Sequence, residues 1–313
     1  MDTIPLGTSS IRVSRLAYGC WRILGPESAE PTASHESNAQ RAIRAAFESG
    51  YTLFDQADIY ADSAAEKVFG DVLKSTPGMR EKIVIATKCG IRKKGAPNPD
   101  SPYRYDFSAE HITKSCEGSL KRLNVETIDV YMLHRPDYLM QPEEVAETFA
   151  RLKQAGKVRE FGVSNFKSHQ LALLQRACPM RLITHQVEVS LAKLDCFDDG
   201  TLEQCLGEKI TVLAWSPLAG GRLSETLPID INSPDHARRI GLRETMDEIA
   251  RDYGVSRTII ALAWLLKHPA NIVPIVGSAK PERIREAANA EKVHLSRDEW
   301  YRLMEAARGE RLP

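Results

Sequence analysis

The sequence predicts an α/β fold, a single (β/α)8 TIM barrel, and three observations carry this prediction. Eight short apolar or β-branched runs recur along the 313 residues, and helical patterns lie between most of them. Four polar side chains follow such runs at the point where each run meets a loop. The carboxyl ends of parallel barrel strands meet at one rim, so residues remote in sequence come together there. A barrel of this kind takes about 250 residues, more with insertions, so we expect residues 1–313 to form one domain.

The elements follow in order from the N-terminus. Residues 3–14 hold two short strand-like runs around Gly7 and Thr8, which predicts a β-hairpin ahead of the barrel. The barrel strands are expected at 16–20, 52–55, 83–88, 128–134, 158–163, 183–187, 211–216 and 272–276. Helical patterns lie at 37–49, 64–73, 108–123, 142–154, 168–176 and 201–206. Extra helices are expected at 235–253 and 257–267, before the eighth strand, and at 296–307 at the C-terminal end.

Two long connections interrupt the regular spacing. Residues 91–107 are rich in Gly, Pro, Lys and Tyr, and residues 218–234 are rich in Gly, Ser and Pro. Both follow strands, so both are expected on the rim where a barrel carries its chemistry.

Charge and composition exclude several classes of protein. Acidic and basic residues balance at 42 each, so the whole chain has no net attraction to nucleic acid or to an anionic membrane. No apolar run reaches about 18 residues, and the first residues do not resemble a signal peptide. The six cysteines form no CxxC pair or His-rich cluster, which predicts buried thiols in a reducing cytoplasm and no metal site.

The four polar residues are Asp55, Tyr60, Lys88 and His134. A phenol donates poorly at neutral pH, and a nearby ammonium favours its ionised form, so we expect Lys88 to assist Tyr60. Asp55 would hold and balance the lysine, while His134 would orient a substrate oxygen. This set suits protonation of a carbonyl oxygen as hydride reaches its carbon, and because no side chain donates hydride, a nicotinamide is required.

Six ordered motifs resemble the aldo-keto reductases over nearly the whole chain, and most of all the bacterial members of broad or unassigned carbonyl specificity. They are FDQADIY (54–60), KCG (88–90) after an apolar strand, LHRPD (133–137), GKVREFGVSNF (156–166), AWSPLAGGRL (214–223) and PIVGSAKPERIREA (274–287). The resemblance implies NADPH-dependent reduction of aldehydes or ketones to alcohols, with hydride from the nicotinamide and the proton from Tyr60. It places the hydride-transfer tetrad on the four polar residues.

The resemblance also implies the cofactor-binding residues, which are Trp21, Ser164, Asn165, Gln186, Trp215, Ser216, Pro217, Leu218, Gly220, Arg222, Gly277, Ser278, Lys280, Arg283 and Glu286. Trp215 stands where the family usually stacks a tyrosine on the nicotinamide. Arg283 would hold the adenosine 2′-phosphate through its forked donors, so NADP(H) is favoured over NAD(H). Gly277 stands where many members carry a lysine, and Lys280 is expected to supply the missing charge. The absence of a GxGxxG motif argues against a Rossmann site.

Other interpretations stay open at this point. Lys88 on a barrel strand also suits a Schiff-base aldolase. A non-catalytic or weakly catalytic nucleotide-binding redox sensor or partner protein is the main alternative. Trp21, Tyr60 and Trp215 suggest an aromatic-lined pocket for small or aromatic aldehydes, and Arg135, in place of a common aromatic residue, alters its rim. We expect a cytoplasmic monomer acting on a small-molecule carbonyl substrate, with no nucleic-acid or membrane partner; the physiological substrate is not encoded in any motif.

Overall fold

The computed structural model describes residues 1–25, 32–225 and 234–312. Its centre is a closed barrel of parallel strands that follow one another round the ring in chain order. The strands are β3 (Ala17–Gly19), β4 (Leu53–Asp55), β5 (Val84–Cys89), β8 (Ile128–Leu133), β9 (Val158–Ser164), β10 (Leu182–Glu188), β11 (Thr211–Trp215) and β12 (Val273–Val276). β12 pairs with β3 and closes the ring. The predicted barrel is therefore confirmed.

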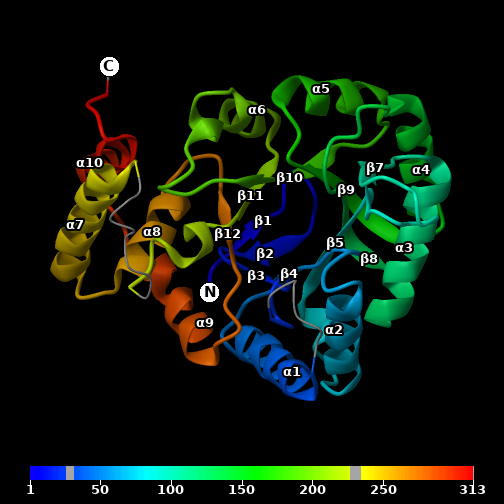
Figure 1. Ribbon diagram of the computed structural model, residues 1–313, viewed down its shortest axis with the longest axis horizontal. Helices are drawn as coiled ribbons and strands as arrows, with labels where there is room; N and C mark the ends of the chain where they lie inside the picture. The colour runs from blue at the N-terminus through cyan, green and yellow to red at the C-terminus, as the bar shows by residue number, and fades with distance from the viewer. Residues whose placement is uncertain (26–31, 226–233, 313) are drawn as a thin grey trace.

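Helices surround the strands, as Figure 1 shows. Those that lie between or after barrel strands are α1 (Ala33–Glu48), α2 (Ala64–Lys74), α3 (Ala109–Leu123), α4 (Pro142–Gln154), α5 (Ser168–Ala177), α6 (Thr201–Glu208) and α9 (Pro281–Ala287). The predicted extra helices are α7 (His236–Tyr253), α8 (Arg257–Leu266) and, near the C-terminus, α10 (Arg297–Arg308). α7 and α10 pack side by side at one edge of the molecule (Figure 1).

The predicted N-terminal hairpin closes the end of the barrel opposite the carboxyl ends of the strands. Its strands are β1 (Thr3–Pro5) and β2 (Arg12–Ser14), and they pair antiparallel. The turn residue Gly7 has φ of +58° and lies so close to Ile183 that a Cβ would come within 2.5 Å of the Ile183 carbonyl oxygen. Leu6 and Ile11 are buried among apolar side chains from the barrel strands. The hairpin thus seals the core at the amino ends of the strands.

The structure differs from the prediction at three places. The connection at 91–107 contains a small hairpin, β6 (Ile91–Arg92) and β7 (Arg104–Tyr105), whose two-residue strands are too short to show a period in sequence. α1 begins four residues earlier than expected, after the capping side chain of Thr32. α9 was not predicted, because Pro281 suggests a loop although it stands in the helix's first turn, where proline is tolerated. Residues 226–233 of the other long connection lie outside the described residues.

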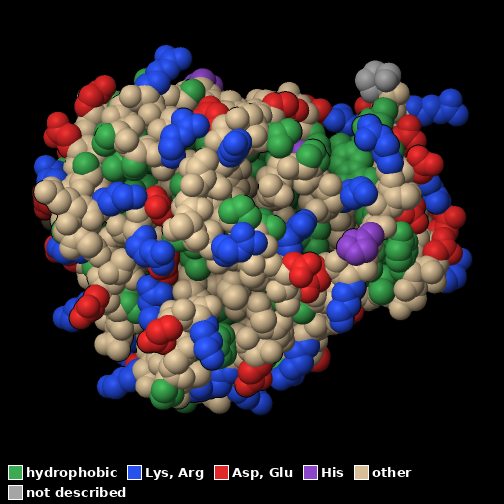
Figure 2. Space-filling model, turned by 180° about the vertical axis from the view of Figure 1, so that it is seen from behind, with side chains coloured by type: hydrophobic (Ala, Val, Ile, Leu, Met, Phe, Trp, Pro, Cys, Tyr) green, Lys and Arg blue, Asp and Glu red, His purple; other side chains and the backbone are tan. Residues whose placement is uncertain are grey.

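The surface carries interspersed charges. Figure 2 shows acidic and basic side chains scattered among one another on the face opposite that of Figure 1. On this face no large area of one sign stands out, in keeping with the equal numbers of acidic and basic residues in the sequence.

One glycine decides how closely two barrel strands approach below the rim. At Gly162 in β9, an added Cβ would stand 2.1 Å from Thr184 Oγ1 and 2.6 Å from the Thr184 carbonyl oxygen in β10. Only a residue without Cβ fits, and β9 ends two residues later at Ser164. The close approach therefore fixes where the end of β9 lies at the mouth of the barrel.

We expect Gly162→Ala to destabilise the fold by about 1–3 kcal/mol, because the methyl group forces β9 away from β10. Gly207→Ala is the matched control, since nothing lies within 4 Å of an added Cβ there and the residue is helical. In a helix this change is neutral or stabilises by up to about 1 kcal/mol. Urea unfolding followed by circular dichroism measures both. Equal midpoints for the two variants would contradict a tight β9–β10 contact.

Candidate active site

Lys88 stands at the centre of the site. Its side chain is 0 % exposed, and its ammonium lies 2.8 and 2.9 Å from the two carboxylate oxygens of Asp55. The same nitrogen donates to the Gln56 carbonyl oxygen at 2.6 Å and to the Tyr60 hydroxyl oxygen at 2.9 Å. Burial lowers the pKa of Lys88, and the contact with Asp55 opposes that shift. The ammonium thus donates to three neighbours at once.

Tyr60 differs in one respect from the expectation that Lys88 favours its ionised form. Burial raises the pKa of Tyr60 well above its ordinary value, and the charge of Asp55 raises it further. The residue is 8 % exposed, so desolvation is the largest cause of the raised pKa, and the positive charge of Arg135 only partly opposes it. Tyr60 therefore carries its proton in this state. Because Lys88 can only donate, the phenol oxygen accepts from it, and the hydroxyl hydrogen is left for another partner.

His134 faces the tyrosine across the mouth of the barrel. The two rings lie 6.0 Å apart, centre to centre, at an angle of 78°. Burial lowers the pKa of His134 well below its usual value, and the positive charges of Lys88 and Arg135 lower it further. The imidazole is therefore neutral near pH 7. Its buried Nδ1 has no hydrogen-bond partner within the described parts of the chain, so the ring is poorly satisfied by the protein itself.

A second set of polar groups, Ser164, Asn165 and Gln186, is hydrogen-bonded to the tetrad and to its neighbours. Gln186 Nε2 donates to Asp55 Oδ1 at 2.7 Å, and the Gln186 carbonyl oxygen accepts from Ser164 Oγ at 3.0 Å. Asn165 donates through Nδ2 to the His134 carbonyl oxygen at 3.1 Å, and its Oδ1 accepts from the Trp215 indole at 3.0 Å. Asn165 adopts φ of +60°, which asparagine tolerates better than most residues. These amides hold neighbouring groups in place.

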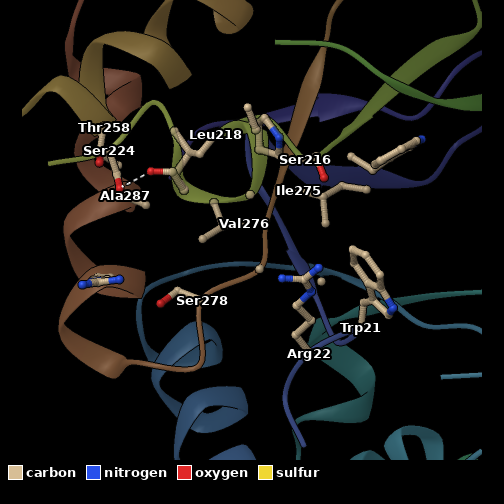
Figure 3. Close-up of a pocket in the computed structure, with 18 of the residues that line it drawn as sticks. Trp21, Arg22, Ser216, Leu218, Ser224, Thr258, Ile275, Val276, Ser278 and Ala287 are labelled. Atoms are coloured by element: carbon tan, nitrogen blue, oxygen red, sulfur yellow. Dashed lines mark hydrogen bonds between the residues drawn. The ribbon is translucent and has the colours of Figure 1, made fainter. Parts of the chain in front are cut away.

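A cavity of about 460 Å³ opens beside the tetrad, which is ample for a nucleotide-sized ligand. Asp55, Tyr60 and Glu188 line it, and so do eleven of the expected cofactor residues: Trp21, Trp215, Ser216, Pro217, Leu218, Gly220, Arg222, Gly277, Ser278, Arg283 and Glu286. Figure 3 shows Trp21 and Arg22 on one side and Ser224, Thr258 and Ala287 at the far end. The sequence motifs therefore do converge on one elongated pocket.

The remaining expected cofactor residues do not line this cavity. Ser164, Asn165 and Gln186 are not part of the lining, and their side chains are hydrogen-bonded to one another or to Asp55. Lys280 is exposed and lies outside the lining, unlike its neighbours Ser278 and Arg283.

Sequence reasoning missed several lining residues. Arg22 and Glu188 are charged examples, and Glu188 stands opposite Trp215 in the β10–β11 register. Glu188 lies two residues after Gln186 on β10, so the alternation of side chains along a strand was a signal for it, whereas Arg22 follows Trp21 in a turn and had no such signal. Thr258 was missed because it belongs to α8, whose place beside the cavity depends on the fold.

Asp58 is a buried carboxyl under the loop that carries Tyr60. One oxygen accepts from the Ser115 hydroxyl, while the other is buried without a partner among the described residues. Its backbone N–H donates to the Lys88 carbonyl oxygen at 3.1 Å. Burial raises the pKa of Asp58 to about 7, although the bond from Ser115 opposes the shift. The other charges that act on it come from Glu66, Arg122 and Lys88.

The described residues show neither an activated cysteine nor a metal-binding cluster. All six cysteines are buried and free, and burial raises the pKa of Cys89, next to Lys88, well above its ordinary value, so its thiol is not activated. No group of three or more His, Cys, Asp or Glu side chains suited to a metal ion exists in residues 1–25, 32–225 and 234–312. Across the same residues, every helix is too short or too polar to span a bilayer.

Comparison with known proteins decides the family. The model of the aldo/keto reductase family matches residues 15–308. The chain belongs to the aldo/keto reductase family. It is 41 % identical to a 6-dehydroglucose reductase of Novosphingobium aromaticivorans, with 98 % of this chain and 96 % of that protein covered. It is 38 % identical to the oxidoreductase YdhF of Escherichia coli over the full length of both. Among solved structures, the glycerol dehydrogenase of Gluconobacter oxydans superposes with a TM-score of 0.88 at 27 % identity, covering 100 % of this chain and 97 % of the other.

This reductase is therefore a nicotinamide-dependent oxidoreductase that acts on carbonyl compounds. The expected family and fold are confirmed. A redox sensor or partner protein without catalysis is not favoured, because relatives matched along the whole chain are named as reductases or oxidoreductases.

The buried Asp58 predicts a pH-dependent stability. An aspartate in an unfolded chain titrates near pH 4, whereas in the fold the pKa of Asp58 is about 7. The fold therefore favours the protonated form, and this contribution is complete below about pH 4 and is lost as the pH rises through about 7. Asp58→Asn does not titrate, so its free energy of unfolding relative to wild type should rise by roughly 2–3 kcal/mol between pH 5 and pH 8.

Urea unfolding at the two pH values measures this difference. The control is Asp71→Asn on α2, whose side chain is half exposed, and its difference from wild type should be the same at both pH values. A difference for Asp58→Asn that does not change with pH would show that the carboxyl is ionised throughout.

Proposed function

We propose that this reductase converts aldehydes or ketones to alcohols with NADPH, and that Tyr60 supplies the proton. The observation that carries the proposal is the donor direction between Lys88 and Tyr60. Because the buried ammonium donates to the phenol oxygen at 2.9 Å, the hydroxyl hydrogen is free to point into the pocket that Tyr60 lines. A substrate oxygen placed there receives that hydrogen bond.

Proton transfer follows from this arrangement. As negative charge builds on the substrate oxygen, Tyr60 passes its proton to that oxygen and becomes a phenolate. Lys88 already donates to the phenol oxygen, so the new charge is neutralised without movement of the ammonium. Asp55 holds the ammonium with both of its oxygens and keeps it aimed at the tyrosine. The raised pKa of Tyr60 keeps the hydroxyl group protonated before the substrate binds.

His134 orients the same substrate oxygen. The ring is neutral, so one of its nitrogens is a donor and the other an acceptor. The His134 ring lies edge-on to Tyr60, so its N–H would give the substrate carbonyl oxygen a second hydrogen bond and orient the carbonyl group. A neutral imidazole does this without adding a competing acid at neutral pH.

The pocket fits a nicotinamide dinucleotide, which when bound supplies hydride to the carbonyl carbon. Flat indole faces at Trp21 and Trp215 suit the nicotinamide end near Tyr60, and the lining from Ser216 to Arg222 suits the diphosphate. Ser164, Asn165 and Gln186 do not line the cavity. They would bind the nicotinamide carboxamide only through polar atoms that remain accessible at the edge of their own hydrogen-bonded cluster.

NADPH is proposed over NADH because Arg283 lines the far part of the pocket, beside Ser278. Its guanidinium forms no hydrogen bond or ion pair with other described residues, and a forked donor of this kind matches a phosphate monoester. Lys280 is exposed and lies three residues before Arg283. It is not part of the cavity lining, so its side chain would contact a phosphate only by extending toward the cavity from outside.

An oxidised hexose is the first substrate to test, since the relative from Novosphingobium aromaticivorans is named a 6-dehydroglucose reductase. That name describes a sugar carrying a terminal aldehyde, which fits the carbonyl chemistry of the tetrad. A single-domain, monomeric and cytoplasmic enzyme stays a prediction, and the six free cysteines support a reducing compartment.

Tyr60→Phe tests the acid. We expect kcat to fall by about 10²–10⁴-fold, because general acid catalysis is worth that much, while the Kd for NADPH changes less than about twofold. NADPH absorbance in an aldehyde assay gives kcat, and protein fluorescence titration gives Kd. Tyr301→Phe, on the exposed side of α10, is the control and should behave as wild type. Near-normal turnover by Tyr60→Phe would remove this residue from the role.

Arg283→Ala tests cofactor choice. Loss of a charged hydrogen bond to a phosphate should weaken NADPH by about 10–100-fold and NADH by less than about twofold. Arg285→Ala on the same helix is the matched control, because that side chain points to Glu48 at 3.9 Å and does not line the pocket. Dissociation constants for both cofactors are measured for each variant. Equal weakening of NADPH and NADH would mean that Arg283 has a structural role only.

A further inference from the structure

Asp58 is a buried titratable group that the proposed mechanism does not use. It lies two residues before Tyr60 on the same loop, and it does not line the cavity. One of its carboxyl oxygens accepts from the Ser115 hydroxyl on α3, and the other, Oδ1, is buried without a hydrogen-bond partner among the described residues. A buried carboxylate with a single donor is poorly satisfied, so this environment favours the neutral acid.

The backbone of Asp58 fastens the loop that carries Tyr60. Its N–H donates to the Lys88 carbonyl oxygen at 3.1 Å, and its carbonyl oxygen accepts from Ser63 Oγ at 2.6 Å. Between Tyr60 and α2, the three successive residues 61–63 have positive φ angles of 47°, 53° and 74°. Residues other than glycine keep this left-handed conformation only where the surrounding contacts enforce it. Asp58 therefore ties the tyrosine loop to the strand that carries Lys88 and, through Ser115, to α3.

The charges around Asp58 leave its carboxyl close to balance between its two forms. The titratable or charged groups that interact with it are Glu66 on α2, Arg122 on α3, Lys88 and Cys89 on β5, Tyr131 on β8 and, on its own loop, Tyr60. Arg122 lies 2.7 Å from Glu66, and Lys88 lies 2.8 Å from Asp55, so both cations are already paired. Cys89 and Tyr131 stay neutral, because burial raises the pKa of each well above its ordinary value. Burial is also the main reason that the pKa of Asp58 is raised to about 7.

We propose that Asp58 is a positioning residue that acts through Tyr60: as a neutral carboxyl it lets the tyrosine give up its proton, and as a carboxylate it slows that step. Proton transfer moves the Tyr60 hydrogen to the carbonyl oxygen and leaves a phenolate, while hydride from NADPH reaches the carbonyl carbon. A second negative charge buried two residues away repels that phenolate. Asp58 exchanges its own proton with solvent and takes no part in the transfer. This inference rests on the proposed function, because it takes Tyr60 as the acid.

The direction of the pH dependence follows from these contacts. Burial is the main cause of the raised pKa of Tyr60, and the charge of Asp58 adds to it, so ionised Asp58 makes the tyrosine a weaker acid. Burial lowers the pKa of His134 well below its usual value, and the pKa of Tyr60 lies well above its own, so neither group changes its protonation state near pH 7. Reduction should therefore be fastest where Asp58 is neutral, and it should slow as the pH rises through about 7.

The experiment measures the rate of a single turnover against pH. Enzyme in excess over NADPH is mixed with saturating benzaldehyde or, in parallel, propanal, and the loss of NADPH absorbance is followed by stopped flow between about pH 5.5 and 9. A single turnover leaves out product release, which limits kcat in many enzymes. The wild-type rate should fall by about 3–10-fold to a lower plateau, which corresponds to up to about one pKa unit on the tyrosine. Asp58→Asn does not ionise, so its rate should change by less than about twofold over the same range.

Ser115→Ala is the second variant, and it serves also if Asp58→Asn does not fold, as judged by circular dichroism. The Ser115 hydroxyl favours the carboxylate of Asp58, so its loss should move the midpoint of the rate profile to higher pH by about one unit, the size of one hydrogen bond to a charged group. Thr113→Ala is the matched control, because it removes a hydroxyl from the same helix that bonds only the Ala109 carbonyl oxygen. Its midpoint should stay at the wild-type value. A purely structural role of Asp58 would not produce a midpoint that Ser115 shifts.

The possible results separate this inference from the function on which it rests. A flat wild-type profile, or a fall that persists in Asp58→Asn with an unchanged midpoint in Ser115→Ala, would overturn the role of Asp58. Slow turnover by Tyr60→Phe would then still support the tyrosine as the acid. A wild-type enzyme that binds NADPH but oxidises none with either aldehyde, or a Tyr60→Phe variant with a normal single-turnover rate, would overturn both.

Discussion

The buried ammonium of Lys88 is the constraint on which the mouth of the barrel depends. A fully desolvated cation is tolerated only when its donors are satisfied and its charge is balanced. Asp55 supplies the charge from the end of the neighbouring strand, because β4 and β5 pair in parallel with Asp55 opposite Ala86. Breaking a buried pair of this kind usually costs about 3–5 kcal/mol. The ion pair that positions the ammonium next to Tyr60 therefore also holds the ends of β4 and β5 together.

From Lys88, one hydrogen-bonded chain runs round the rim. Asp55 accepts from Gln186, and the backbone carbonyl of Gln186 accepts from Ser164. Asn165 then joins Ser164 to Trp215 and to the carbonyl oxygen of His134; its Nδ2 lies 2.8 Å from Ser164 Oγ. The chain links the ends of β4, β5, β8, β9, β10 and β11. The Trp215 indole, the Lys88–Asp55 pair and the backbone of His134 are thus parts of one hydrogen-bonded network.

Much of this arrangement was accessible from sequence, for a physical reason. Strand and helix alternation predicts a parallel barrel, and such a barrel gathers its strand ends, so Asp55, Lys88 and His134 had to lie near one another. Tyr60 lies on the loop after β4, and its contact with Lys88 was a hypothesis that needed the motif. The burial that keeps Tyr60 protonated was not visible, since desolvation depends on what packs around the group.

Other features were inaccessible because they depend on register or on distant elements. Asn165 stays a predicted cofactor residue, but sequence did not indicate that its amide also bonds the His134 carbonyl oxygen, after the neighbouring strand β8, and the Trp215 indole, on β11. The environment of Asp58 depends on α3, which supplies the Ser115 hydroxyl that bonds one of its two oxygens. The short strands β6 and β7 and the helix α9 fall below the length at which hydrophobic period is informative.

The rim network has an evolutionary consequence. A residue that is hydrogen-bonded on two sides, such as Asn165 or Gln186, cannot be exchanged alone without leaving a buried polar group unpaired, so these positions can change only in concert. Glu188 lines the cavity outside this network, and its carboxylate has no hydrogen-bond or ion-pair partner among the described residues. Descendants of this chain can therefore change side chains of the cavity wall one at a time, while the hydrogen-bonded network is inherited as a unit.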